Sequence, residues 1–202
     1  TTSATAVTAL TAAMNAYGPA AFKGTTATEK FSNISDIMFQ GVNVGIFRFD
    51  DLTGMLAETA GLASNAGIGL KELVGGMAAM SRAGLSGAES GTAMNRLLQK
   101  MIQPSKALNE EMHKLGFESG LQMIKTKGLV ESMQMLQKAS QGNVNTLVQW
   151  FPEIRAARGA MALMANGGAN LTNVMNGMAI SAGATDRAFA RQSGTFAVKF
   201  AE

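Results

Sequence analysis

The residue types that could carry catalysis are few in this chain, and their spacing does not suit it. His113 is the only histidine, which excludes a His–His metal pair and an HExxH zinc site within these 202 residues. Its neighbours Glu110 and Glu111 lie within one helical turn, so charge contacts on a solvated helix face are the favoured interpretation. Asp50 and Asp51 form the tightest carboxylate pair, but adjacent residues at a helix start point apart. Capping of free amides is therefore favoured over acid–base chemistry.

A glycine pair at Gly67 and Gly69 begins like a dinucleotide-binding loop. Glu72 stands where the third glycine would be, and no strand precedes the pair, so a junction between two helices is the favoured interpretation. The chain has no cysteine, which excludes disulfides and thiolate metal sites. We therefore expect no catalytic residue, no cofactor and no metal site, and a protein that is not an enzyme.

Large apolar residues recur every three or four positions along almost the whole chain, and the alternation typical of strands is missing. This pattern predicts an all-α fold: about ten short-to-medium helices packed as an irregular helical bundle, without a sheet, over most of residues 3 to 200. The apolar stripes are Val7, Leu10, Met14 and Tyr17; Phe31, Ile34 and Met38; Leu52, Met55, Leu56 and Leu62; Leu70, Leu73, Val74 and Met77; Met94, Leu97, Leu98 and Met101; Leu108, Met112 and Leu115; Val130, Met133 and Leu136; Val144, Leu147, Val148 and Phe151; Ile154, Ala157, Met161 and Met164; Leu171, Val174, Met175 and Met178; and Phe189, Phe196 and Phe200.

Short boundary signals divide these stripes. Ser86 and Glu89 have the spacing of a capping box, and Pro104 suits the first turn of a helix. Glycines interrupt the pattern at Gly18, Gly67, Gly84, Gly116, Gly128, Gly142, Gly167 and Gly168. A single helix of 202 residues would extend roughly 300 Å at about 1.5 Å per residue. The repeated glycines instead favour short helices that fold back on one another.

The composition narrows the classes of function. Hydrophobic residues make up 47% of the chain but aromatic residues only 6%, so the core is expected to be built from small and flexible side chains. The net charge of +3 is spread without a basic run, which argues against a dedicated nucleic-acid site. Two stretches, 1–22 and 159–185, carry no charge, but threonines, asparagines and glycines interrupt them, so neither is expected to be a transmembrane helix.

Several short motifs follow one another in a specific order. Asp36 lies in the first, Ser35 to Gln40, and the densest is Ala83 to Leu98, which reads AGLSGAESGTAMNRLL. In this order and spacing, the stretch from Ser35 to about Met164 resembles the core region of phage tail tape-measure proteins, also called minor tail proteins. Its motif and core residues are Asp36, Leu73, Val74, Gly84, Gly87, Glu89, Gly91, Thr92, Leu97, Leu98, Pro104 and Ser105.

The resemblance implies a domain organisation. Residues 35–164 form the core-like region and 165–202 a helical continuation. Because the chain opens on Thr1 rather than Met and stops at Glu202 within a helical pattern, we expect residues 1–202 to be a single helical fragment of a longer chain. The resemblance also implies a virion structural protein that lies inside the tail, sets tail length during tube assembly and is ejected ahead of the DNA. The implied partners are other copies of the chain, tail tube and tail tip proteins, tail assembly chaperones and, on ejection, the host membrane. The implied locations are the virion tail interior and, during assembly, the host cytoplasm.

Two alternatives stay open at the level of sequence. A membrane-active, pore-forming or lytic helical protein would account for the two charge-free stretches, and liposome leakage would favour it. A peptidoglycan hydrolase is the third, because some tape-measure proteins resemble carriers of such domains. No hydrolase motif is found in this chain.

Overall fold

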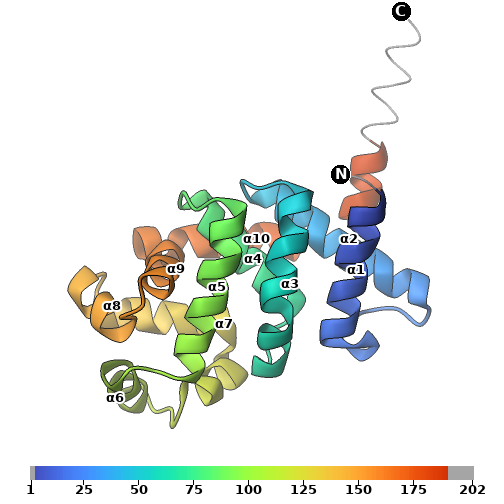
Figure 1. Cartoon of the computed structure of the whole chain (residues 1–202). Coiled ribbons are helices and arrows are strands. Elements are labelled where there is room, and N and C mark those ends of the chain that lie inside the picture. The colour runs from blue at the N-terminus through green and yellow to red at the C-terminus, as the bar shows by residue number, and fades with distance from the viewer. Residues whose placement is uncertain (1–2, 191–202) are drawn as a thin grey trace, which may run out of the picture.

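The computed structural model describes residues 3–190, and every regular element in that range is a helix (Figure 1). The elements are α1 (Ser3–Tyr17), η1 (Pro19–Ala21), α2 (Ala27–Val44), α3 (Phe49–Ala66), α4 (Leu70–Arg82), α5 (Gly87–Ile102), α6 (Lys106–Lys114), α7 (Gly120–Ser140), α8 (Val144–Trp150), α9 (Ile154–Met164), η2 (Ala165–Gly168) and α10 (Ala169–Ala179). Residues 184–190 are helical as well. The predicted all-α fold is confirmed. Phe196 and Phe200 lie outside the described residues.

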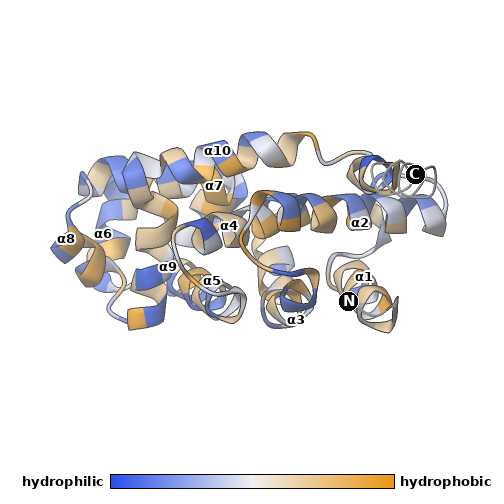
Figure 2. Cartoon of the chain, turned by 90° about the horizontal axis from the view of Figure 1, so that it is seen from above, coloured by the Kyte–Doolittle hydropathy of each residue, from blue (hydrophilic) through white to orange (hydrophobic). Residues whose placement is uncertain are grey.

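The helices form two layers in an elongated array. Seen from above, α1, α3 and α5 stand end-on in a row, and α2 and α10 run lengthwise behind them (Figure 2). Within the row α3 contacts both α1 and α5, and α5 contacts α9. In the other layer α4 contacts α2 and α10, and it also contacts α5. Helices α6 and α8 lie at one end of the array and α1 at the other (Figure 1).

The core between the layers is built mainly from aliphatic side chains, methionine and alanine. The predicted pair of helices from Leu70 to Ile102 is confirmed as α4 and α5, and it lies in the middle of this core. Leu73, Val74, Leu97 and Leu98 are fully buried. Small side chains let the helix axes approach, and methionines fill the irregular gaps that remain.

Some residues of the predicted stripes do not lie in the core. Val7, Val144, Val148, Ile154 and Phe189 are 44 to 73% exposed. In α1 Ala9 and Ala13 are fully buried. Of the predicted stripe, Leu10, Met14 and Tyr17 are partly buried against the core, and only Val7 lies outside it. Helix α8 lies at the end of the array, where Leu147 and Trp150 are covered and the opposite face has no neighbouring layer.

Most of the predicted boundaries are confirmed. The backbone has a positive φ at each predicted glycine break, for example φ 85° at Gly67, which ends α3. Gly128 differs in kind, because it interrupts α7 rather than ending it, with φ 75° and ψ 171°. The prediction for Pro104 was wrong. Ser105 is the N-cap of α6, so Pro104 precedes the cap and lies outside the first turn.

The two charge-free stretches form separate short helices. The first gives α1 and η1, and the second is divided among α9, η2 and α10 by left-handed turns at Asn166 and Gly167. Among residues 3–190, no helix combines the length and apolar character that crossing a bilayer requires.

Candidate functional site

The densest motif of the sequence forms the corner between α4 and α5. Gly84 follows α4 with φ 100°, a conformation that side chains rarely adopt. Ser86 is the N-cap of α5: its hydroxyl accepts a hydrogen bond from the Glu89 amide at 3.3 Å, and Glu89 Oε2 accepts from the Ser86 amide at 2.9 Å. The predicted capping box is therefore confirmed. It fixes the start of α5 and the direction of its first turn.

The glycines of this motif bring α5 close to α3. A Cβ on Gly87 would lie 2.6 Å from Cβ of Asp51, and one on Gly91 would lie 3.0 Å from Cα of Met55. Neither helix can accept larger residues here without moving apart. At the opposite face of the core, a Cβ on Gly41 of α2 would overlap Cγ1 of Val74. Gly41, Gly87 and Gly91 thus serve as contact points between helices.

Polar contacts then tie α5 to the helices on either side. Toward α3, the Thr92 hydroxyl donates to Glu58 Oε2 at 3.2 Å, and the Asn95 amide donates to the Glu58 carbonyl oxygen. Toward α9, Arg158 forms an ion pair with Glu89 at 3.1 Å. The pKa of the Glu89 carboxyl is lowered by hydrogen bonds from the Ser86 amide and hydroxyl and by Arg158. The outer face of α5 is therefore a polar surface shared by three helices.

This surface is hollowed on both sides of Thr92. One cavity of about 370 Å³ lies between the first half of α5 and Arg155 and Arg158 of α9. A second, of about 410 Å³, lies between the second half of α5, Glu58 and Arg155. Both are open, and polar and apolar atoms line them in nearly equal parts. The sequence motif marked Glu89 and Thr92 in this groove, but nothing in the sequence indicated that Arg155 joins them from α9.

A sequence model of one family, described as phage-related minor tail protein, matches residues 1–149. The chain belongs to that family. The match covers α1 to α7 and almost all of α8, and it therefore includes the α4–α5 corner and most of the groove. It confirms the resemblance that the motifs indicated. A search of curated proteins and a search of solved structures each found no match.

Asp36, another motif residue of this minor tail protein, holds the end of the described chain. Its carboxylate is almost fully buried and accepts hydrogen bonds from the Gly183 amide at 2.7 Å and the Thr185 amide at 3.0 Å. These amides lie at the start of the helical residues 184–190. The sequence motif marked Asp36, but its contact with a segment almost 150 residues away was not predicted.

Ser105 joins two helices at the far end of the array. Its hydroxyl oxygen accepts a hydrogen bond from the Leu108 amide at 3.2 Å and so caps α6. The same hydroxyl lies 2.9 Å from the carbonyl oxygen of Trp150, to which it donates at the end of α8. Here a motif residue has a structural role that its sequence neighbourhood did not indicate.

Glu72, which stands where a dinucleotide-binding loop would have its third glycine, is partly buried and has a structural role. Glu72 Oε1 accepts a hydrogen bond from the Val130 amide at 2.7 Å, just after the interruption of α7 at Gly128. Burial raises the pKa of Glu72, and the hydrogen bonds from Val130 and Leu129 oppose this effect. Burial and, next, the charge of Glu72 raise the pKa of the Tyr17 phenol, whose hydroxyl is buried without a hydrogen-bond partner.

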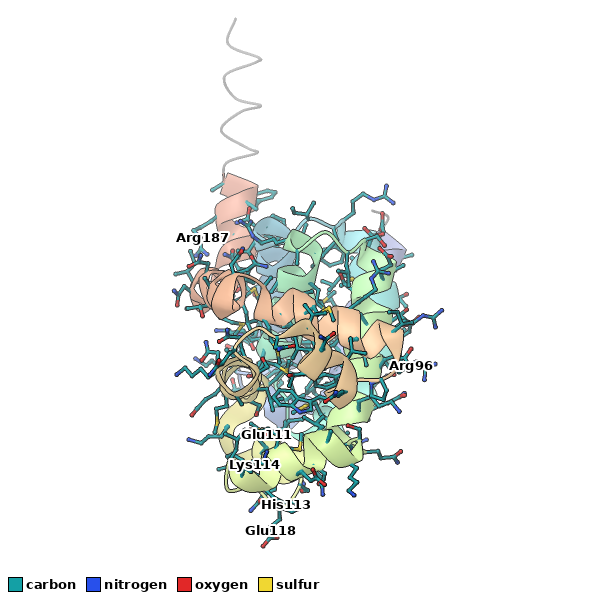
Figure 3. The ribbon with its side chains drawn as sticks, turned by 90° about the vertical axis from the view of Figure 1, so that its left-hand side faces the viewer. Arg96, Glu111, His113, Lys114, Glu118 and Arg187 are labelled. Atoms are coloured by element: carbon teal, nitrogen blue, oxygen red, sulfur yellow. The ribbon has the colours of Figure 1, made fainter. Side chains whose placement is uncertain are left out.

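Of the residues first considered for chemistry, His113 and Glu110 are exposed, and Asp50, Asp51 and Glu111 are partly exposed. His113 projects from the exposed side of α6, where its ring lies 3.1 Å from the Asn109 amide and where Glu111 pairs with Lys114 at 3.0 Å (Figure 3). Asp51 Oδ2 accepts from the Arg48 amide at 2.8 Å, which confirms its capping role. Within residues 3–190, no three metal-ligating side chains are grouped so as to hold an ion.

Proposed function

We propose that this chain is a folded, non-catalytic segment of a tape-measure protein, which sets tail length while tube protein polymerises and leaves the virion ahead of the DNA. The match to the minor tail family over residues 1–149 carries the proposal. It has further support from the motif order, because the densest motif coincides with the α4–α5 corner. The residues of that corner cap, pack and pair with neighbouring helices.

The proposal separates two kinds of segment within one long protein. A ruler segment acts through its extended length, about 1.5 Å for each helical residue. The α4–α5 pair instead lies in the middle of a two-layered core, with Leu73 and Leu97 fully buried. We therefore assign this region to a compact domain that the ruler carries. Its expected partners are other copies of the chain, tail tube and tip proteins, assembly chaperones and, on ejection, the host membrane.

Deletion of residues 70–102 from the complete protein tests this assignment. Removal of α4 and α5 exposes the apolar faces of α2, α3, α9 and α10, so we expect tail assembly to be blocked or disordered. Uniform, infectious particles with tails shorter by about 50 Å in electron micrographs would place the region within the ruler instead.

Leu97→Asp is the matched variant, because it disrupts the same core without changing chain length. A compact domain predicts that this variant also blocks assembly. A segment that acted by length alone would give normal tails of normal length with it. Loss of the whole protein tests the length-setting role itself. Tails of variable length in particles without the protein would support that role, and tails of unchanged, uniform length would refute it.

A membrane-active protein remains the competing proposal, and it would have to use the charge-free stretches. The second of these is divided by the turn at Asn166 and Gly167 into helices whose buried residues, such as Leu163 and Leu171, face the core. That arrangement favours a role in packing. Leakage of liposomes caused by the chain at neutral pH would favour the membrane-active protein.

A further inference from the structure

Two cavities beside α5 form a groove along its outer face. Its two cavities, of about 370 and 410 Å³, share Thr92 and Arg155 and follow α5 from Leu85 to Gln99. At about 1.5 Å per helical residue this path is roughly 20 Å long. An extended peptide of about six or seven residues has the same length.

The arginines of the groove are not equally engaged. Arg158 is paired with Glu89 at 3.1 Å. The guanidinium of Arg96, at the surface in Figure 3, donates to the neutral side-chain oxygen of Gln99 at 3.0 Å, and no carboxylate of residues 3–190 pairs with it. Arg155 lines both cavities and, among residues 3–190, has no carboxylate within ion-pair distance of its guanidinium. Two guanidinium groups therefore face the groove without an acidic partner.

The acids of the groove are, by contrast, already bonded. Glu58 accepts from the Thr92 hydroxyl at 3.2 Å, and Glu89 accepts from Ser86 and pairs with Arg158. Glu58 lines the same cavity as Arg96 and Arg155, and Glu89 lines the other cavity beside Arg158, so each cavity contains a carboxylate. A nucleic-acid strand has a phosphate at every nucleotide and would bring phosphates against these glutamates. A peptide can place carboxylates at the arginines and neutral residues at the glutamates.

We propose that this groove binds an acidic segment of another protein, whose carboxylates pair with Arg155 and Arg96. Guanidinium groups pair with carboxylates through two parallel hydrogen bonds, which supply orientation as well as attraction. The amide side chains of Asn95 and Gln99 line the same wall, where they bond to Glu58, to each other and to Arg96. Each amide group has a second N–H that can donate to the backbone of an extended peptide. This inference goes beyond the length-setting role and does not depend on it.

Fluorescence anisotropy with defined probes tests the proposal on the whole chain at low salt. The probes are a labelled seven-residue peptide with three glutamates, the same peptide with three glutamines, and a single-stranded DNA of seven nucleotides. We expect the glutamate peptide to bind at least about fivefold more tightly than either of the others, as several charge-assisted pairs predict.

The variants locate the binding. Arg155→Gln is expected to weaken the glutamate peptide about fivefold or more, and adding Arg96→Gln is expected to weaken it further. Arg82→Gln removes the same charge from an exposed position outside the groove and is the matched control, with an expected change under about twofold. Equal losses in Arg82→Gln and Arg155→Gln would overturn the proposal, since they indicate attraction by net charge alone.

Further measurements test the site without relying on a folded variant and distinguish other occupants of the groove. Amide chemical shifts of the unaltered chain must change at Thr92, Asn95 and Arg155 when the glutamate peptide is added, and shifts confined to other regions overturn the proposal. Tighter binding of the DNA probe would identify a nucleic-acid groove instead. Concentration-dependent self-association abolished by Arg155→Gln in sedimentation experiments would identify a second copy as the occupant. Either result overturns the proposal that the groove binds an acidic segment of another protein.

Discussion

At the residue scale, Glu72 shows how a carboxylate can hold a fold together without taking part in chemistry. It lies beside the interruption of α7, where a Cβ on Gly128 would approach its Oε1 to 2.9 Å. The Val130 amide, freed by the interruption, donates to the same oxygen. A free amide at a helix start is best satisfied by an acceptor that carries negative charge. Burial makes that charge costly, and the raised pKa of Glu72 reflects this cost.

The pH dependence of stability tests the balance at Glu72. Because its pKa is higher in the folded than in the unfolded chain, the folded chain holds this proton more tightly between the ordinary value of 4.5 and the raised value. The ionisation of Glu72 therefore lowers stability as pH rises through that range. Glu72→Gln keeps an acceptor oxygen but cannot ionise. In urea titrations we expect the free energy of unfolding of Glu72→Gln to rise relative to that of the parent as the pH is raised from 4 to 7.

The control for this experiment is Glu118→Gln, which removes one negative charge from an exposed position. Glu29 and Glu89, whose pKa values are lowered, keep their contributions in both variants and cancel in the comparison. A relative stability of Glu72→Gln that stays constant or falls as pH rises would contradict the role of burial at this position.

A substitution at Leu97 tests the packing of the core. Its side chain is fully buried in α5, so Leu97→Asp places an unpaired charge in an apolar site. We expect a loss of about 3 to 5 kcal/mol in the free energy of unfolding, or a chain that no longer folds. Lys138→Ala, on the exposed surface of α7, is expected to change it by less than about 0.5 kcal/mol. A Leu97→Asp variant that melts within a degree or two of the parent would contradict the packing described here.

At the element scale, the distance between α3 and α5 depends on glycine. Gly91 lies directly against the backbone of Met55, so no side chain separates the two helices at this point. The polar contacts of Glu58 with Thr92 and Asn95 lie one turn further along the same pair. A change in helix spacing would therefore disturb the groove as well as the core.

Two glycine-to-alanine variants separate packing from helix propensity. Gly61 lies in the interior of α3, and apart from its own helical backbone no atom lies within 4 Å of the position that a Cβ would take there. Gly61→Ala is therefore expected to stabilise the chain by about 0.5 to 1 kcal/mol. Gly91→Ala gains the same helix propensity, but its Cβ would press against the Met55 backbone. We therefore expect a net loss of about 1 kcal/mol or more in the free energy of unfolding. Thermal melts measure both. A gain in stability for Gly91→Ala would show that the two helices separate without cost.

At the scale of the whole molecule, the two layers share one continuous core. Buried residues extend from Ala9 in α1 to Trp150 in α8 without a gap between clusters. The carboxylate of Asp36 also connects α2 to the last described segment, because it accepts hydrogen bonds from the Gly183 and Thr185 amides. An array of this kind should unfold as one unit, although it is elongated.

The only tryptophan, Trp150, provides a test of this cooperativity, because it is buried at the end of the array opposite α1. We expect the unfolding transition measured by its fluorescence to coincide with that measured by far-ultraviolet circular dichroism, which reports on all helices. An earlier fluorescence transition would show that α6, α8 and their neighbours form a separate, weaker unit. Asp36→Ala is expected to move both transitions together.

Much of the architecture was readable from sequence because its determinants are local. The all-α fold follows from the spacing of apolar residues, and the interruptions between helices follow from glycines. The Ser86–Glu89 cap involves residues only three positions apart. The family resemblance depends on motif order along the chain and is local in the same sense. The error at Pro104 is a shift of two residues at a boundary, which local signals do not resolve well.

Only the tertiary structure decided which apolar stripes are covered and which distant residues meet. Val7 and Val148 have the spacing of core residues, but whether a second layer covers them depends on where the array ends. The contacts of Asp36 with Thr185, Glu72 with Val130 and Glu89 with Arg158 join residues 58 to 149 positions apart. Spacing within one helix carries no information about them. They depend on how closely helices approach, and that distance is decided by the small residues of both partners at once.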